Sequence, residues 1–468
     1  MSYEPRIQTM SHYKDAPHIL LINPWIDDFA AYDFWAKPMG LLTIAGILRA
    51  LGYRITYLDA LDRFFGGLSG AVQKATAKRF GRGPYLKTPL LKPARLKDVP
   101  RNYSRYGIPE ELFRTFISEI PKPDAVLITS IMTYWYPGVF AAIRIVKKLL
   151  PDTPVILGGI YATLCREHAL SQSGADHVIS GPGEEAAITL LGALTGYWPK
   201  QETRMDNLDA LGFPAFDMQK HIPYVPILTS RGCPFRCRYC ASGFLNPKMR
   251  WRRPERVVDE ILHWRNACGV NDFVFYDDAL LIDAESHIIP ILEGVIRQQT
   301  GVRFHTPNAL HIREISAELA RILYLAGFAT IRLGLETAVF ANRKDLDNKV
   351  AAGEFEQAVR FLKEAGFAGE QIGVYLLFGL PGQRLSDLQL SIEVVKRAGV
   401  RPVLAEYSPV PHTALWQEAV RASRYDIESD PVFHNNSLFP CWKEGFSWEK
   451  SRIFKQMARN ACYRPSHK

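Results

Sequence analysis

Along residues 18–200, short continuous runs of hydrophobic residues alternate with segments that are apolar at helical spacing. Strands buried on both faces read as continuous apolar runs, and parallel strands need helical connections between them. The pattern therefore predicts an α/β fold with a parallel, doubly wound, Rossmann-like sheet. Strands are expected at 19–24, 55–61, 125–130, 154–157 and 178–180, and helices at 40–51 and 138–150.

The alternation continues in the second half of the chain. Residues 201–222 have the character of a linker, and an apolar run at 225–230 follows them. Six parallel strands with outer helices predict a partial (β/α)6 barrel over 223–420, with its chemistry at the carboxyl ends of the strands. The later strands are expected at 272–276, 302–306, 329–335, 371–378 and 402–407. Residues 1–17 and 421–468 are extensions, the second with a helix expected at 447–460.

The composition is that of a folded protein with more than one domain. Hydrophobic residues make up 47% of the 468 residues and charged residues 22%, which excludes disordered and fibrous classes. The first residues mix both charge signs without an apolar core, so they are not a secretory signal. Residues 125–143 are uncharged, but Pro137 and Gly138 interrupt them. We therefore expect no transmembrane segment and a cytoplasmic protein.

The net charge of +9 is concentrated in one insertion at about residues 66–108. Residues 74–105 carry ten Lys or Arg against the single acid Asp98. This segment is either a solvated, proline-punctuated insertion or a grip on an anionic substrate. No aromatic-interleaved nucleic-acid module accompanies it, so nucleic acid is not expected as a partner.

Three of the seven cysteines, Cys233, Cys237 and Cys240, lie within eight residues directly after a predicted strand. Thiolates are the ligands of iron–sulfur clusters, and three of them leave one iron of a [4Fe–4S] cluster open to bind a small molecule. A structural zinc ion takes four ligands, and the next cysteine, Cys268, lies beyond a predicted helix. Zinc and plain structural or reactive thiols are the competing interpretations.

The cysteine segment reads TSRGCPFRCRYC from Thr229 to Cys240. Its Cys-x3-Cys-x2-Cys spacing, with Tyr239 before the last cysteine, resembles the radical S-adenosylmethionine (SAM) superfamily over about residues 222–416. The resemblance implies that the three cysteines bind a [4Fe–4S] cluster and that the open iron binds SAM. One electron would then cleave SAM to a 5′-deoxyadenosyl radical.

Polar residues and a glycine follow the barrel strands, where the resemblance implies contacts with SAM. The expected SAM-binding residues are Tyr239, Asp277, Asp278, Asn308, Glu336, Thr337 and Gly379. The aspartate pair would face the methionyl ammonium, although such a pair is also typical of a turn. Glu336 and Thr337 would contact the ribose and carboxylate, and Gly379 the adenine. His412 is a substrate contact or an exposed turn histidine, and Cys441 is a hydrogen-atom donor or a structural thiol.

The first domain carries a second, independent resemblance. Ser130-Ile131-Met132 is followed by Gly158-Gly159, which is similar to the Ser-x-Leu and Gly-Gly signature of cobalamin-binding domains. This implies that Ser130, Gly158 and Gly159 contact cobalamin. The chain lacks Asp-x-His-x-x-Gly, and residues 23–28 read NPWIDD instead. Cobalamin would therefore bind without a lower axial histidine, or the domain has kept its fold and lost the cofactor.

These features predict an enzyme that holds a small-molecule substrate between a cobalamin-type domain and a radical barrel. The resemblance implies hydrogen abstraction from an unactivated C–H bond, with methyl transfer to that carbon where cobalamin is bound. It also implies an external electron donor such as a flavodoxin or ferredoxin. A cobalamin-independent cyclase, isomerase or sulfur-inserting enzyme is the first alternative. A non-catalytic iron–sulfur carrier and a zinc-stabilised binding module are alternatives of another class.

Overall fold

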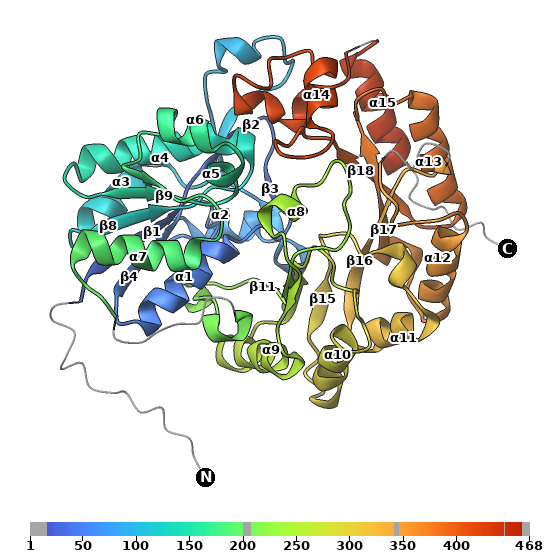
Figure 1. Cartoon of the computed structure of the whole chain (residues 1–468), viewed down its shortest axis with the longest axis horizontal. Coiled ribbons are helices and arrows are strands. Elements are labelled where there is room, and N and C mark those ends of the chain that lie inside the picture. The colour runs from blue at the N-terminus through green and yellow to red at the C-terminus, as the bar shows by residue number, and fades with distance from the viewer. Residues whose placement is uncertain (1–15, 200–206, 341–345, 444, 461–468) are drawn as a thin grey trace.

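Two parallel sheets form the body of the molecule in the computed structural model, which describes residues 16–199, 207–340, 346–443 and 445–460 (Figure 1). The first sheet has five strands in the order β10-β9-β8-β1-β4, and the second has six in the order β11-β14-β15-β16-β17-β18. The α/β class, the doubly wound sheet and the six-stranded partial barrel are confirmed. The domain bounds stay a prediction, and residues 1–15, 200–206 and 461–468 of the extensions and linker lie outside the described residues.

The first sheet is buried on both faces because its central strand is apolar throughout. All six residues of β1 (His18–Asn23) are buried. Ile19 and Leu21 pack on the side of α1 (Met39–Ala50) and α7 (Gly183–Thr195). Leu20 and Ile22 pack on the side of α3 (Glu110–Glu119) and α4 (Tyr136–Leu149). The other elements are β4 (Arg54–Asp59), β8 (Ala125–Ile128), β9 (Val155–Leu157), β10 (His177–Val178), α5 (Ile160–Leu164) and α6 (Arg166–Gln172).

The basic insertion is more structured than its composition indicated. It pairs with the segment after β1 to form a three-stranded antiparallel sheet in the order β2-β7-β6, and β3 pairs with β5. These strands have two or three residues each, too few for alternation to show in the sequence. The elements are β2 (Ile26–Asp28), β3 (Tyr32–Asp33), α2 (Gly70–Thr76), β5 (Gly83–Pro84), β6 (Lys87–Pro89) and β7 (Ser104–Tyr106).

The second sheet follows the predicted strands closely, with one correction. The single strand expected at 225–230 is split into β11 (Val225–Ile227), which belongs to the sheet, and β12 (Ser230–Arg231), which pairs with β13 (Arg250–Trp251). The later strands are β14 (Asp272–Phe275), β15 (Arg303–His305), β16 (Phe328–Glu336), β17 (Ile372–Phe378) and β18 (Arg401–Glu406). The helices are α8 (Ser242–Leu245), α9 (Pro254–Cys268), α10 (Ile288–Arg297), α11 (Ala317–Leu325), α12 (Glu354–Glu364) and α13 (Leu385–Arg397).

The two halves are joined by contacts at both ends of the chain. Trp35 of the first half stacks on His305 of β15 with ring centroids 4.6 Å apart. The segment between α14 (Trp416–Ala422) and α15 (Trp448–Arg459) returns to the first domain. There Asp430 accepts a hydrogen bond from the Tyr136 hydroxyl at 2.8 Å, and the Asn435 amide donates to Asp28 at 2.7 Å. The helix expected at 447–460 is confirmed.

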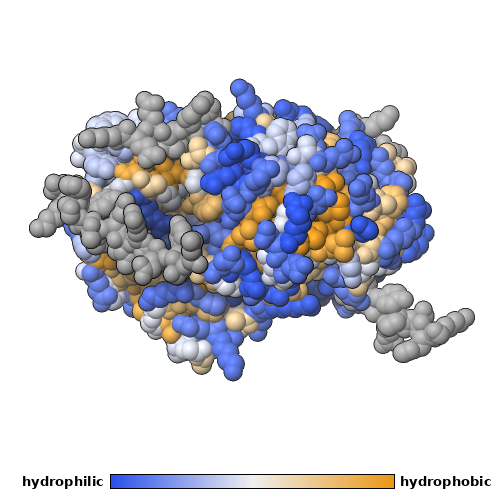
Figure 2. All heavy atoms as spheres, turned by 90° about the horizontal axis from the view of Figure 1, so that it is seen from below, coloured by the Kyte–Doolittle hydropathy of each residue, from blue (hydrophilic) through white to orange (hydrophobic). Residues whose placement is uncertain are grey.

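Hydrophilic residues cover most of the face that Figure 2 shows from below, with hydrophobic patches between them. The stretch at 125–143 that resembled a membrane span forms β8, a short turn of helix and the first part of α4. Within the described ranges, none of the helices combines the length and the apolar character that a membrane crossing requires.

Candidate functional site

The cysteine loop begins at a tight turn beyond the first barrel strand. Ser230 of β12 pairs with Trp251 of β13, and Gly232 follows with a φ of +97°. A Cβ at Gly232 would lie 2.6 Å from the Lys248 carbonyl oxygen, which is closer than such atoms can approach. Only glycine fits here, and the turn directs the chain into the segment that begins at Cys233.

A buried carboxylate holds the backbone that enters this loop. Asp277 is 3% exposed and accepts hydrogen bonds from the backbone amides of Thr229 and Ser230 at 3.0 and 2.6 Å. Both hydroxyls also donate to it, at 2.7 and 2.6 Å. Because Thr229 donates its proton to Asp277, the His287 Nε2 at 2.8 Å from that hydroxyl oxygen must be a donor. Sequence reasoning assigned Asp277 to SAM and missed this structural role.

The three thiols differ in exposure. Cys233 and Cys237 are partly buried, and Cys240 is exposed. Burial raises the pKa of Cys233, and it raises the pKa of Cys237 to about 11, although the neighbouring Lys349 acts in the opposite direction. The Ser242 amide donates to Cys240 Sγ at 3.4 Å.

These donors fit a multi-iron cluster better than a single metal ion. In the ranges that the structure covers, no group of three or more His, Cys, Asp or Glu side chains is gathered closely enough to hold one ion. The ligands of a cluster sit on separate irons and lie further apart, and thiolates are the donors that such clusters take. The residues present therefore fit the [4Fe–4S] cluster that the spacing predicted.

Lys349 is a site residue that no motif indicated. Its Nζ donates to Glu336 Oε1 at 2.6 Å, and the two side chains are 8% and 7% exposed. Burial lowers the pKa of Lys349, but Glu336, Cys237 and Asp347 together outweigh that effect and the pKa is raised. The ammonium also lies 5.6 Å from the centroid of the Tyr239 ring. A charged lysine beside Cys237 stabilises a thiolate at that position.

Two of the predicted SAM contacts have unusual surroundings. Glu336 has a φ of +60°, a left-handed conformation that non-glycine residues adopt mainly at functional sites. The buried hydroxyl of Tyr239 lies beside Cys237 and, within the described part of the chain, has no nitrogen or oxygen partner for a hydrogen bond. A hydrogen bond from this hydroxyl to the Cys237 sulfur acts to lower the pKa of Cys237.

The other predicted SAM contacts follow successive strands. Asn308, exposed after β15, donates to the carbonyl oxygens of Tyr276 at 2.8 Å and Asp277 at 3.2 Å. Thr337 directly follows β16. Gly379 follows β17 with a φ of +92°, and its amide donates to Gln383 at 2.7 Å. The structure thus brings these residues to one edge of the barrel sheet, as the parallel topology requires.

His412 and Cys441 have different surroundings. His412 reaches the first domain: its Nε2 donates to the Leu164 carbonyl at 3.1 Å, and its ring stacks on Phe244 with centroids 4.1 Å apart. Cys441 is 3% exposed and donates to the Ala419 carbonyl at 3.6 Å. Burial raises the pKa of Cys441 to about 12, as expected for a packed structural thiol. Its role as a hydrogen-atom donor stays a prediction.

The residues predicted to contact cobalamin form one compact turn. The Ser130 hydroxyl donates to the Gly158 carbonyl at 2.7 Å and accepts from the Ala162 amide at 3.3 Å. Gly159 has a φ of +99°, and a Cβ there would lie 2.2 Å from the Ser130 carbonyl oxygen. The turn after β9 therefore requires glycine, and its backbone is open to a ligand.

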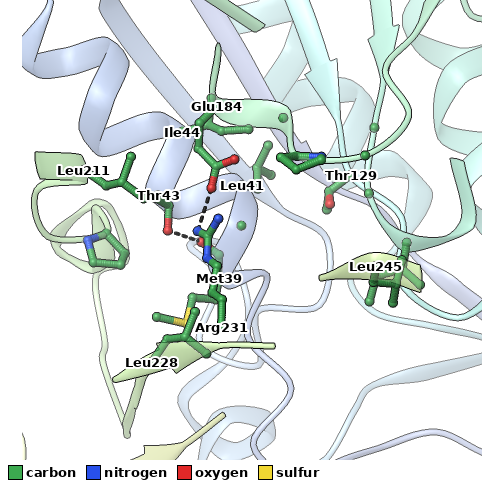
Figure 3. A pocket seen from close by; sticks show the side chains of 18 of the residues that line it. Met39, Leu41, Thr43, Ile44, Thr129, Glu184, Leu211, Leu228, Arg231 and Leu245 are labelled. Atoms are coloured by element: carbon green, nitrogen blue, oxygen red, sulfur yellow. Dashed lines mark hydrogen bonds and ion pairs between the residues drawn. The ribbon is translucent and has the colours of Figure 1, made fainter. Parts of the chain in front are cut away.

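A cavity of about 420 Å³ lies between this turn and the barrel. Gly158, Gly159 and the start of α7 line it from the first domain, and Ser230, Arg231 and Asp278 line it from the second. Leu41, Ile44, Leu211 and Leu245 are among its apolar walls (Figure 3). Arg231 crosses the cavity to Glu184 at 2.6 Å, with the two side chains 17% and 10% exposed. Burial raises the pKa of Asp278, against a hydrogen bond from Ser242.

Comparison with known families assigns both halves of the chain. A model of the radical SAM superfamily matches residues 227–395, and a model of the B12 binding domain matches residues 98–191. The chain carries a radical SAM domain and a B12-binding domain. It is therefore an enzyme whose cofactors are a [4Fe–4S] cluster, SAM and cobalamin.

Characterised proteins resemble this radical SAM enzyme over most of its length. Cytidylyl-2-hydroxyethylphosphonate methyltransferase of Streptomyces wedmorensis is 22% identical over 88% of this chain and 83% of the relative. Anaerobic magnesium-protoporphyrin IX monomethyl ester cyclase of Cereibacter sphaeroides is 25% identical over 64% of this chain and 53% of the relative. The structure of the radical SAM methyltransferase TsrM from Kitasatospora setae matches with a TM-score of 0.63 at 16% identity, covering 87% of this chain and 76% of TsrM.

The B12-binding domain of this enzyme lacks the histidine pattern in the segment after β1. The segment after β1 that would carry the histidine is built into β2, where Asp27 pairs with Arg105 at 2.9 Å and Asp28 accepts from the Trp135 indole at 2.8 Å. Neither aspartate lines the cavity between the domains. The site residues that sequence reasoning missed are Thr229, His287, Lys349, Arg231 and Glu184. Two of these five residues could have been found from the sequence. Thr229 and Arg231 lie on either side of Ser230, directly before the cysteines.

Proposed function

We propose that this radical SAM enzyme methylates an unactivated carbon of a small-molecule substrate, and that the cavity between its two domains is where the reacting groups meet. The observation that carries the proposal is the lining of this cavity. One wall is the glycine turn of the B12-binding domain, and the other is the strand that leads into the cysteine loop together with Asp278. When bound, the cluster supplies the electron that cleaves SAM, and cobalamin supplies the methyl group.

The chain's own residues supply binding, orientation and exclusion of water. We assign cluster ligation to Cys233, Cys237 and Cys240, and Lys349 supports the thiolate of Cys237. Tyr239, Asn308, Glu336, Thr337 and Gly379, at the carboxyl edge of the barrel, are proposed to hold SAM. Asp278 is the carboxylate we assign to the methionyl ammonium, because it faces the cavity. Asp277 holds the loop.

On the cofactor side, Ser130, Gly158 and Gly159 are proposed to hold cobalamin. The Ser130 hydroxyl ties the end of β8 to the glycine turn, and the apolar walls of the cavity exclude water from the reacting groups. We further propose that a small electron-transfer protein of the flavodoxin or ferredoxin type delivers the electron. A reducing, cytoplasmic setting belongs to this proposal, because the cysteines that ligate the cluster must stay reduced.

Replacing one cluster ligand tests the radical chemistry. We expect Cys237→Ala to lose both the iron–sulfur absorbance after anaerobic reconstitution and the formation of 5′-deoxyadenosine, because each requires the thiolate. Cys268→Ala is the matched control, since Cys268 is exposed at the end of α9, away from the loop, and it should keep both. A Cys237→Ala protein that still carries a cluster and cleaves SAM contradicts the assignment.

A second candidate, ring formation, is supported by the similarity to anaerobic magnesium-protoporphyrin IX monomethyl ester cyclase. The two functions differ in the fate of the SAM methyl group. Methylation removes it and leaves S-adenosylhomocysteine, whereas cyclisation by a radical leaves only 5′-deoxyadenosine and methionine. Formation of both S-adenosylhomocysteine and 5′-deoxyadenosine by the reconstituted enzyme supports methylation. Deoxyadenosine alone, with corrin retained, supports cyclisation.

A further inference from the structure

The cations of the basic insertion have different partners. Arg105 forms an ion pair with Asp27 at 2.9 Å, and Arg95 forms one with Asp430 of the carboxy-terminal segment. Arg79 lies over the Phe80 ring at 4.3 Å, and Arg82 lies over the Trp35 ring at 5.0 Å. Arg82, Arg95 and Arg105 anchor the insertion to the rest of the molecule, whereas Arg79 packs within it.

Three other cations of the insertion converge on one pocket. Lys87 of β6, Lys92 and Arg101 line a concave site of about 500 Å³, together with Phe29, Asn102 and Ser104. No aspartate or glutamate is among its lining residues. Within the described ranges, no ion pair joins any of the three cations to a carboxylate. The pocket therefore concentrates positive charge, and its lining contains no carboxylate.

The geometry of the pocket restrains two of these cations. Lys92 Nζ donates to the Val99 carbonyl at 2.5 Å, and the Arg101 guanidinium lies 6.0 Å from the centroid of the Phe29 ring. The nearby carboxylate of Asp28 is 2% exposed and already accepts hydrogen bonds from Trp135 and Asn435. Asp28 interacts electrostatically with Arg101 but is not among the residues that line the pocket. Cations held together in this way repel one another unless an anion joins them.

We propose that Lys87, Lys92 and Arg101 form a binding site for an oxyanion of the phosphate or phosphonate type. Lysine and arginine are the side chains that bind such groups, by charge and by several N–H donors. Asn102 and Ser104 add uncharged polar groups to the same lining. The volume of the pocket exceeds that of a bare phosphate, so it also has room for the part of a molecule that carries the group.

This site is separate from the cavity of the proposed reaction. The two share no lining residue. Phe29 of the pocket follows Asp28, which accepts a hydrogen bond from the Trp135 indole at 2.8 Å. An anion bound here therefore occupies a place distinct from the cavity between the domains. The inference does not depend on the proposed methylation.

The test uses the full chain with its cluster reconstituted, titrated by calorimetry with inorganic phosphate, cytidine 5′-monophosphate and acetate. We expect saturable binding of a phosphate compound that weakens as salt is added. Lys87→Gln combined with Arg101→Gln should weaken it by at least about tenfold. Lys74→Gln combined with Lys97→Gln removes the same charge from exposed positions of the same insertion and should leave binding within about twofold. Lys87→Arg keeps the charge and should keep binding.

The outcomes separate two sources of the anion. Equal affinity for inorganic phosphate and the nucleotide indicates a site for the free ion, whereas tighter nucleotide binding indicates a site for the phosphate of a larger molecule. Absence of saturable binding, equal binding of acetate, or equal loss in the Lys74 and Lys97 control overturns the proposal. Thermal unfolding of each variant establishes that it is folded. Deoxyadenosine formation, measured on the same samples, reports on the radical chemistry independently.

Discussion

Adjacent residues of the site have different roles because their side chains meet different surroundings. Asp277 turns into the protein and accepts four hydrogen bonds within 3.0 Å from Thr229 and Ser230. Asp278 faces the cavity, where burial raises its pKa. Lys349 is similarly fixed by one neighbour, Glu336. At this scale, the role of a side chain follows from its partners and not from its residue type.

The hydrogen bonds of Asp277 lead to a prediction about the cysteine loop. Asp277→Asn places an amide N–H₂ against backbone and hydroxyl donors, so we expect a loss of about 3 kcal/mol in the free energy of unfolding. Iron content after reconstitution should fall as the loop loosens. Asp278→Asn is the neighbouring control, and its unfolding free energy should change by less than about 1 kcal/mol. Denaturant unfolding of both variants measures this, and equal stabilities would contradict the positioning role.

The buried histidine of the same network predicts a dependence on pH. Burial lowers the pKa of His287 from 6.5 to about 4, so the unfolded chain takes up a proton at a higher pH than the folded one. The stabilisation from neutral His287 is therefore complete above pH 6.5 and is lost progressively as the pH falls toward 4. Unfolding measured from pH 7.5 to 4.5 should show this decline, and His287→Gln should make it shallower. If stability declines with falling pH as steeply in His287→Gln as in the original protein, the decline does not come from His287.

At the scale of elements, the sequence predicts those helices and strands that have a repeating pattern of buried residues. The long strands and amphipathic helices of both domains lie within a few residues of their expected bounds, because burial on one or both faces imposes a repeat. The strands of the insertion were not predicted, since two or three residues carry no repeat and pair with strands far away in the chain. The turns at Gly232 and Gly159 each require glycine, and the structure is what shows this requirement.

The glycine turn after β9 gives a test at this scale. Gly159→Ala combines a φ of +99° with a Cβ 2.2 Å from the Ser130 carbonyl oxygen, so we expect a loss of about 3 kcal/mol in unfolding free energy. Gly158→Ala is the matched control, because its Cβ would meet only the Ile179 carbonyl oxygen at 4.0 Å. Its loss should stay below about 1 kcal/mol. Equal destabilisation of the two variants by urea contradicts the steric argument.

At the scale of the whole molecule, the domains are held together by polar contacts that neither domain forms alone. His412 reaches Leu164, Asn435 reaches Asp28, and Arg231 reaches Glu184 across the cavity. Arg231 lies two residues before Cys233, at the start of the cysteine loop. The position of the loop relative to the B12-binding domain therefore depends on docking between the domains.

The Arg231–Glu184 pair makes that dependence measurable. Glu184→Gln leaves a largely buried guanidinium without its counter-charge, so we expect about 2 kcal/mol less unfolding free energy. Exchanging the charges, with Arg231→Glu and Glu184→Arg together, should recover part of the loss. Arg49→Gln is the control, because its pair with Asp217 is 48% and 44% exposed and contributes below about 1 kcal/mol. If Glu184→Gln and Arg49→Gln lose the same unfolding free energy, the Arg231–Glu184 pair does not couple the two domains.

The sequence by itself determined the two α/β domains and the cysteine loop, because periodicity and ligand spacing are properties of neighbouring residues. The radical SAM chemistry followed from the resemblance of that loop to a known superfamily. It also placed the polar residues at the strand ends, since parallel strands end at one edge. Only the tertiary structure decided which aspartate faces the cavity, that Lys349 lies beside Cys237, and that three cations of the insertion share one pocket. Those facts depend on contacts between residues far apart in the chain, which no local pattern records.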